Sequence, residues 1–96
     1  MYKRQVFYKG EHEAAYSGFE GRTSAGDPLT DWLRVRQVEE VDVCGIATDH
    51  CVRATALDST SEGFTTRVLT ALCAGVAEES TAAAITELAG AGVEIA

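Results

Sequence analysis

The chain has 96 residues, of which 46% are apolar, and this combination indicates one small folded domain rather than a disordered chain. Its formal net charge of −7 argues against nucleic acid or an anionic membrane as a partner, because both attract basic surfaces. The three cysteines form no CxxC pair, so they favour a reduced, cytoplasmic protein over a zinc module or a disulfide framework. No apolar run is long enough to span a membrane, and no signal peptide is visible.

The first stretch of the chain predicts a strand followed by a long loop. The apolar run VFY within residues 3–9 is typical of a strand. Residues 11–27 are polar and rich in glycine, and so long a connection in a compact domain is often functional. Because Tyr16 and Phe19 lie within it, three interpretations stay open: a lid over a site, a loop that lines a substrate, or an Ω-loop packed on its own aromatic side chains.

The rest of the chain alternates between helical and strand patterns. The first helix is expected to begin with Asp27 as its cap and Pro28 at its first position. Then follow a strand over residues 41–46, a helix from about His50 to near Gly63, a strand over 65–72, a helix over 78–89 and a short strand over 93–96. This alternation predicts an α/β fold with a parallel sheet flanked by helices, in which ligands bind at the carboxyl ends of the strands.

The stretch VDVCGIATDHCVRAT, residues 41–55, is the centre of the predicted fold. Its strand breaks abruptly into a helix, which leaves the first backbone N–H groups of that helix unpaired. Cys51 lies in this first helical turn, where the helix dipole favours an anion such as a thiolate. The pattern is that of a nucleophile elbow with cysteine as the nucleophile. The alternative for Cys51 is a buried apolar residue, which is what we expect of Cys44 and Cys73.

Lys9 is the second candidate for chemistry. It ends the first expected strand, whereas Cys51 follows the second, so a parallel sheet would place both at one edge. A nearby ammonium favours the ionised thiol and would make Cys51 a better nucleophile. An ordinary surface lysine is the alternative, because lysine is almost never buried without a partner.

Two stretches of the sequence carry a resemblance to a known family. The first consists of residues 6–10 followed by 15–21, and the second of residues 41–53, which contain GIATDHCV. They resemble the cysteine amidohydrolases of the isochorismatase-like superfamily, and most closely the nicotinamidases, also called pyrazinamidases. The resemblance covers nearly the whole chain. It implies a Rossmann-like three-layer α/β/α fold, of which residues 1–96 would be the C-terminal part, with four strands and three helices.

The resemblance also implies roles for individual residues. Cys51 would attack an amide carbonyl, Lys9 would belong to the same catalytic triad, ammonia would leave and water would hydrolyse the thioester. The bond between Ile46 and Ala47 would be cis, and the N–H groups of Ala47 and Cys51 would form the oxyanion hole. A flat pyridine ring would be lined by Tyr16, Ile46, Ala47 and His50.

Two parts of such a site have no counterpart in this chain. In the family, the third triad member, an aspartate, and the ligands of a divalent metal (Zn, Fe or Mn) lie upstream of the strand that carries the lysine. We therefore assign no cofactor and no metal ligand here, and Glu11, His12 and Glu13 lack the spacing of a metal site. Asp49 is close to Cys51 in sequence, but its turn position suits a cap of the helix that follows.

The expected function is hydrolysis of nicotinamide to nicotinate and ammonia, which would feed NAD salvage. The partner would be a small amide such as nicotinamide or pyrazinamide, and the activity of this chain by itself stays open. One alternative is another isochorismatase-like cysteine hydrolase with a different substrate. The other is an inactive half-domain that forms a homo-oligomer through an exposed sheet edge.

Overall fold

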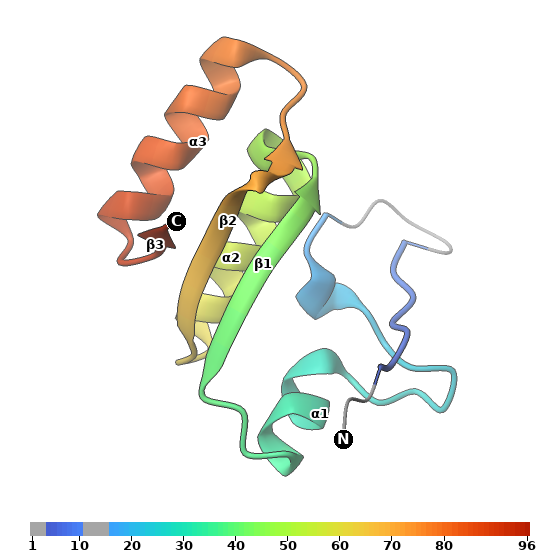
Figure 1. The fold of residues 1–96 in the computed structure, drawn as a ribbon. Helices are drawn as coiled ribbons and strands as arrows, with labels where there is room; N and C mark the ends of the chain where they lie inside the picture. The colour runs from blue at the N-terminus through green and yellow to red at the C-terminus, as the bar shows by residue number, and fades with distance from the viewer. Residues whose placement is uncertain (1–3, 11–15) are drawn as a thin grey trace.

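The computed structural model describes residues 4–10 and 16–96. The strands of its sheet are β1 (Glu40–Ile46), β2 (Thr65–Ala74) and β3 (Glu94–Ile95). The helices are α1 (Leu29–Val35), α2 (Arg53–Ser61) and α3 (Glu78–Gly90), with a 3₁₀ turn over Gly18–Glu20 and a π-helical turn over Thr48–Val52. The strands are parallel and lie in the order β1-β2-β3, so β2 is central (Figure 1).

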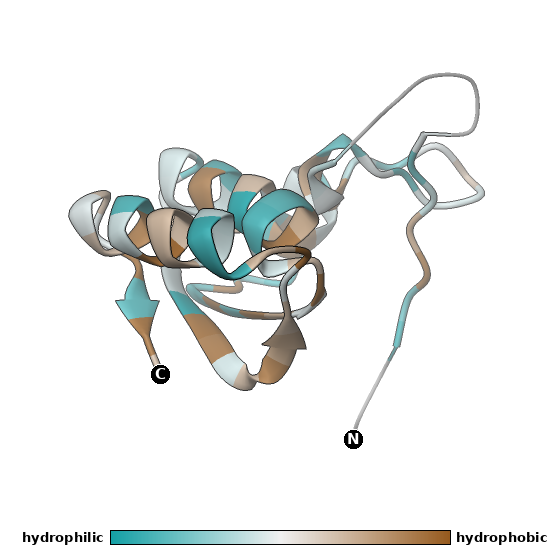
Figure 2. Ribbon diagram, turned by 90° about the horizontal axis from the view of Figure 1, so that it is seen from above, coloured by the Kyte–Doolittle hydropathy of each residue, from teal (hydrophilic) through white to brown (hydrophobic). Residues whose placement is uncertain are grey.

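One apolar core joins the sheet to α2 and α3. Figure 2 shows both helices on the same side of the sheet. Val43 of β1 is in register with Val68 of β2, and these side chains are 7% and 0% exposed. Burial of an aliphatic side chain contributes about 1.5–3 kcal/mol, so this cluster holds the two helices on the sheet. Its buried members are Val43, Val52, Ala56, Val68, Leu88 and Val93.

The observed elements confirm the predicted α/β class with a parallel sheet and three helices. The strands expected over 41–46 and 65–72 and the helix expected over 78–89 are present, with ends displaced by at most about two residues, which is the usual scatter of such boundaries. The helix expected from His50 is present as the π-helical turn followed by α2.

The strand expected over residues 3–9 is wrong for the part that the structure describes, so the sheet has three strands rather than four. Tyr8 exchanges two backbone hydrogen bonds with Arg22, at 2.8 and 3.0 Å, in an isolated antiparallel bridge. Val6 is 54% exposed and Tyr8 is 52% exposed. A short apolar run becomes a strand only beside a neighbouring strand, and the partner of this run is a local loop residue.

Two smaller expectations are also corrected. Pro28, rather than Asp27, is the cap residue of α1, because the carboxylate and the N–H of Asp27 both contact the hydroxyl of Thr23. Cys44 is exposed rather than buried, since it follows the buried Val43 and successive side chains of a strand point to opposite faces. Cys73 is half-buried, and its Sγ donates to the carbonyl of Leu69 at 3.2 Å.

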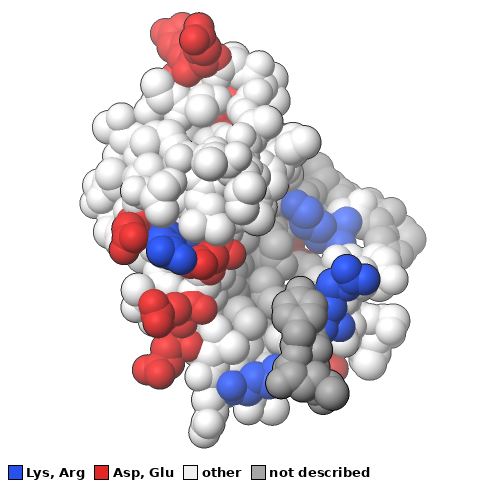
Figure 3. Space-filling model, viewed as in Figure 1, with Lys and Arg blue, Asp and Glu red and all other residues white. Residues whose placement is uncertain are grey.

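The face of the sheet that points away from α2 and α3 carries exposed groups. Arg67 and Asp42 form an ion pair across β1 and β2, with 2.8 Å between Nη2 and Oδ2. Figure 3 looks at this side and shows acidic groups over the sheet and at the start of α3, and basic groups over α1 and the N-terminal segment. Among the residues described, no helix has the length and apolar character needed to cross a bilayer.

Candidate active site

The elbow after β1 is built as the sequence predicts. The peptide bond between Ile46 and Ala47 is cis, as the family resemblance implied. The carbonyl of Ala47 accepts the N–H groups of His50 and Val52, at 3.1 and 2.9 Å, and thereby closes a wide π-helical turn. Cys51 lies in this turn and is half-buried, so its side chain is neither enclosed in the core nor fully exposed.

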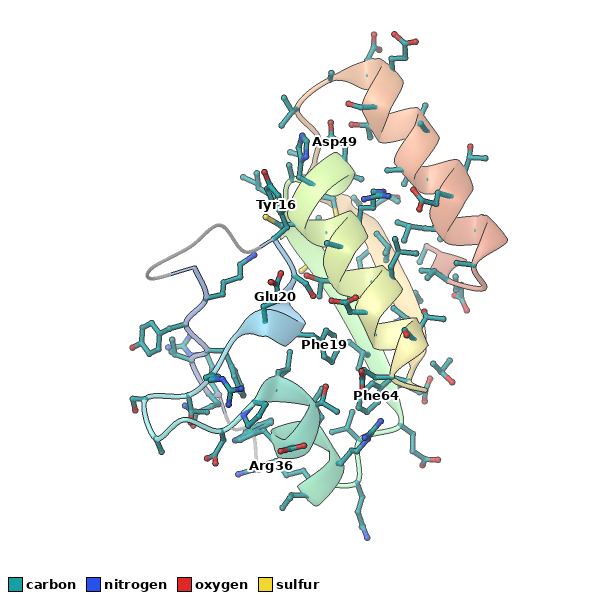
Figure 4. All side chains as sticks on the ribbon, turned by 180° about the vertical axis from the view of Figure 1, so that it is seen from behind. Tyr16, Phe19, Glu20, Arg36, Asp49 and Phe64 are labelled. Carbon is teal, nitrogen blue, oxygen red and sulfur yellow. The ribbon has the colours of Figure 1, made fainter. Side chains whose placement is uncertain are left out.

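Asp49 fixes the elbow to the start of α3. Its side chain is 6% exposed and accepts hydrogen bonds from the hydroxyl of Ser80 and from the N–H groups of Val76, at 3.0 Å, and Ala77, at 3.3 Å. The Ser80 hydroxyl and then these N–H groups lower the pKa of Asp49 to about 2. Asp49 thus bonds to Ser80 of α3 and to the two residues just before that helix, rather than to the helix that follows Asp49 itself, which corrects the expectation (Figure 4).

Lys9, Tyr16 and His50 come together beside the elbow. The ammonium of Lys9 donates to the backbone carbonyl of Tyr16. The ring of Tyr16 stacks on the imidazole of His50, with 6.0 Å between centroids and 29° between planes. Because Cys51 directly follows His50, these contacts link Lys9 to the elbow through Tyr16 and His50.

The four residues expected to line a pyridine ring differ in exposure. Ala47 is 6% exposed, whereas Tyr16 and Ile46 are 57% and 79% exposed and His50 is also exposed. They surround the turn that contains Cys51, but in this chain the turn is open to solvent on their side. Their contacts with a substrate, and the catalytic roles of Cys51 and Lys9, stay predictions.

Two cavities in the described residues lie away from Cys51. One of about 350 Å³ is formed by α1 and the preceding loop, with Trp32 and Asp27 in its wall. Another, of about 440 Å³, borders the start of α3 between Gly75 and Ala82. Neither is lined by Lys9 or Cys51, so we base the candidate site on the elbow and its contacts.

Sequence reasoning missed a short motif before the elbow. The hydroxyl of Ser17 accepts the N–H of Phe19, and the carboxylate of Glu20 accepts the N–H of Ser17, both at 3.0 Å. The spacing S-x-x-E is a sequence signal of this capping box, so it could have been found. Phe19 packs on Phe64, 6.1 Å away, rather than on Tyr16, so the Ω-loop interpretation fails for the described part of the loop.

The described residues offer no metal site. Across residues 4–10 and 16–96, no group of three or more His, Cys, Asp or Glu side chains is arranged to hold a metal ion. Glu11, His12 and Glu13 lie outside the described residues. The described residues by themselves therefore do not fit a divalent metal, and no step below is routed through one.

The parallel sheet, the elbow and its cysteine define an α/β domain with a candidate nucleophile at the carboxyl end of a strand. The chain belongs to the isochorismatase family, because the family described as isochorismatase domain matches residues 9–96. This match confirms the predicted resemblance.

Among individual relatives, nicotinamidases are prominent. The nicotinamidase/pyrazinamidase of Mycobacterium tuberculosis (strain ATCC 25618 / H37Rv) is 58% identical over 90 residues, which cover 94% of this chain and 48% of the relative. The pyrazinamidase of Pyrococcus horikoshii in complex with zinc superposes with a TM-score of 0.78 at 40% identity, covering 88% of this chain and 44% of that one. PnC1 from L. infantum in complex with nicotinate gives 0.75 at 34% identity, with 85% and 41% covered. The chain spans about half the length of the curated relatives it matches.

Proposed function

We propose that this chain is the C-terminal part of a single isochorismatase-like domain and carries the nucleophile of a nicotinamidase-type amidohydrolase. The observation that carries the proposal is the half-buried Cys51 at the elbow, next in the chain to His50, on whose ring stacks the Tyr16 side chain; the Lys9 ammonium donates to the carbonyl of that same Tyr16. The names of the relatives support nicotinamide or pyrazinamide as the substrate, and the L. infantum complex supports nicotinate as the product.

The proposed reaction has two steps. The sulfur of Cys51 attacks the amide carbon, a C–S bond forms, the C–N bond breaks, and the proton that the thiol gives up ends on the leaving nitrogen, so that ammonia departs. Water then attacks the thioester, which releases nicotinate and restores the thiol. The Lys9 ammonium favours the anionic sulfur, because an opposite charge nearby stabilises it.

The backbone of the elbow has a role in both steps. The N–H groups of Ala47 and Cys51 would donate to the carbonyl oxygen as it becomes negative, and one such donor contributes about 3–4 kcal/mol of transition-state stabilisation. Tyr16, Ile46 and His50 would hold the ring from the exposed side. A third triad member and any divalent metal would have to come from the other half of the domain, and we assign them no residue here.

The setting of the enzyme is part of the proposal. The net charge of −7 favours a small molecule over nucleic acid or a membrane as the partner. The product nicotinate fits NAD salvage in the cytoplasm.

Thiol reactivity tests the nucleophile. Exposure alone predicts that Cys44, the exposed cysteine, reacts fastest, whereas an activated nucleophile predicts Cys51. Iodoacetamide at pH 7, with each cysteine peptide followed by mass spectrometry, separates these predictions. We expect Cys51 to be alkylated first and Cys51→Ala to abolish any ammonia release from nicotinamide; alkylation in the order of exposure would contradict the proposal.

A second candidate is a half-domain that associates with itself. Within the described residues β1 pairs only with β2, so its other edge carries unpaired backbone groups. Light scattering on a size-exclusion column, combined with the ammonia assay, distinguishes the two: oligomers without turnover favour self-association. Another isochorismatase-like hydrolase is distinguished by a panel of amide and ether substrates, on which nicotinamide should be the fastest.

A further inference from the structure

Residues 16–20, which we call the Tyr16 segment, determine where the Lys9 ammonium lies. Lys9 does not extend a strand of the sheet, so the sheet itself does not position it. Its ammonium instead donates to the carbonyl of Tyr16, and the ring of Tyr16 rests on His50. Whatever holds the Tyr16 segment therefore also holds the ammonium beside the elbow.

The segment is fixed internally by its capping box. Ser17 is 2% exposed, and its hydroxyl and N–H are both bonded within the segment, to Phe19 and Glu20. These bonds close one turn of 3₁₀ helix and make residues 17–20 a compact unit. Such a unit moves as a whole, so its contacts with the rest of the domain determine its position.

That contact comes from Thr55 on α2. Its Oγ1 accepts the N–H of Gly18 at 2.8 Å, although the two residues are 37 positions apart. The two residues are adjacent, because a Cβ on Gly18 would lie in ordinary van der Waals contact with Cγ2 of Thr55, at 3.4 Å. Thr55 follows Cys51 by four residues, about one helical turn, so the same short stretch of backbone carries the nucleophile and the contact.

A second contact limits rotation of the segment. Phe19 packs on Phe64 at the end of α2, with 6.1 Å between ring centroids. In Figure 4 Phe19 points toward Phe64, while Tyr16 lies near Asp49 at the opposite end of α2. The hydrogen bond to Thr55 lies between these two ends, and it is a polar contact of the segment with α2, whereas the contact of Phe19 with Phe64 is apolar.

We propose that Thr55 is a positioning residue. Its hydroxyl oxygen fixes Gly18, and through the Tyr16 segment it sets the distance between the Lys9 ammonium and the sulfur of Cys51. The inference rests on the proposed function, because Lys9 and Cys51 act together there. Thr55 itself touches neither the substrate nor the reacting atoms.

The test uses Thr55→Val, which keeps the shape of the side chain and removes its hydroxyl, and Thr55→Ser, which keeps the hydroxyl. Thr60→Val makes the same change elsewhere on α2 and is the matched control. In Thr55→Val we expect the Gly18 amide to exchange with solvent about tenfold faster by NMR, because its acceptor is lost. We expect alkylation of Cys51 at pH 7 to slow by about three- to tenfold, because the ammonium moves away.

The conservative variant separates positioning from general destabilisation. Thr55→Ser and Thr60→Val should keep the wild-type exchange rate at Gly18 and the wild-type alkylation rate. An unchanged Gly18 exchange rate in Thr55→Val would overturn the inference, and so would equal losses in Thr55→Ser and Thr55→Val. Should Thr55→Val unfold the chain, Ser17→Ala replaces it: this change loosens the segment without touching α2 and should also slow Cys51 alkylation, and an unchanged rate overturns the inference.

Lys9→Met distinguishes failure of the inference from failure of the proposed function. If Lys9→Met slows Cys51 alkylation and Thr55→Val does not, the positioning role of Thr55 is overturned and the proposed function stands. If Lys9→Met leaves the rate unchanged, the pairing of Lys9 with Cys51 in the proposed function is wrong. In that case positioning of the ammonium by Thr55 is overturned as well, whatever the Gly18 amide shows.

Discussion

Asp49 offers a direct test of how the elbow is attached to α3. Its carboxylate accepts three hydrogen bonds, from Ser80, Val76 and Ala77, while it is almost completely buried. Asp49→Asn keeps the size of the side chain, removes the charge and leaves a single acceptor oxygen. The N–H groups at the start of α3 then compete for that oxygen, so the variant should be less stable than the wild type at pH 7.

The pH dependence of this effect has a defined sign. In the folded chain the pKa of Asp49 is lowered from 3.8 to about 2, so near pH 3 the unfolded chain binds a proton that the folded chain does not. The stability that Asp49 contributes is therefore fully present above about pH 4 and is lost as the pH falls toward 2. With these two pKa values, unfolding at pH 3 takes up about 0.8 of a proton at this carboxylate.

Urea unfolding followed by circular dichroism at several pH values between 2.5 and 6 measures this quantity. We expect the free energy of unfolding of the wild type to fall more steeply with decreasing pH than that of Asp49→Asn. Near pH 3 the two slopes should differ by the amount that corresponds to the uptake of about 0.8 proton on unfolding. Asp58→Asn, which removes the same charge from α2, is the control and should keep the wild-type slope. Identical slopes for the wild type and Asp49→Asn would refute the reasoning.

Two further predictions concern packing, and urea unfolding measures both. A Cβ on Gly75 would lie 1.9 Å from Oγ1 of Thr81, so Gly75→Ala should destabilise the chain by about 1–3 kcal/mol, and adding Thr81→Ala should recover part of the loss. Leu88 is 0% exposed and Leu72 is 62% exposed, so Leu88→Ala should cost about 2–5 kcal/mol and Leu72→Ala less than about 0.5 kcal/mol; equal losses would contradict the position of the core.

The elements that sequence reasoning predicted well are those determined by neighbouring residues. The β-branched run of β1 and the turn residues that follow it indicate the strand and the elbow. Glu78 and Glu79 mark the start of α3, because carboxylates suit the positive end of a helix. Such signals need no knowledge of the tertiary structure, and the structure confirms these elements.

The expectations that failed depend on distant partners. The run VFY within residues 3–9 has the composition of a strand, but composition does not reveal whether a strand lies beside it. Asp49 has the position of a cap for the next helix, yet the hydrogen-bond donors that reach it lie in α3 and in the two residues just before it, 27 to 31 residues later. The contact between Gly18 and Thr55 spans 37 residues and leaves no local pattern.

The same long-range contacts explain how this stretch of chain positions Cys51. The core cluster holds α2 and α3 against one face of the sheet, and Asp49 ties the elbow to α3. Inside this layer the hydroxyls of Ser59 and Thr66 share a hydrogen bond of 2.7 Å. The two residues are 0% and 3% exposed, so this buried bond fixes α2 on β2. Cys51 is therefore positioned by residues within this chain, whereas the Lys9 ammonium bonds, among the described residues, to the Tyr16 segment. Perturbations of the segment should change the reactivity of Cys51 before they change the stability of the fold, and that order is what the Thr55 variants measure.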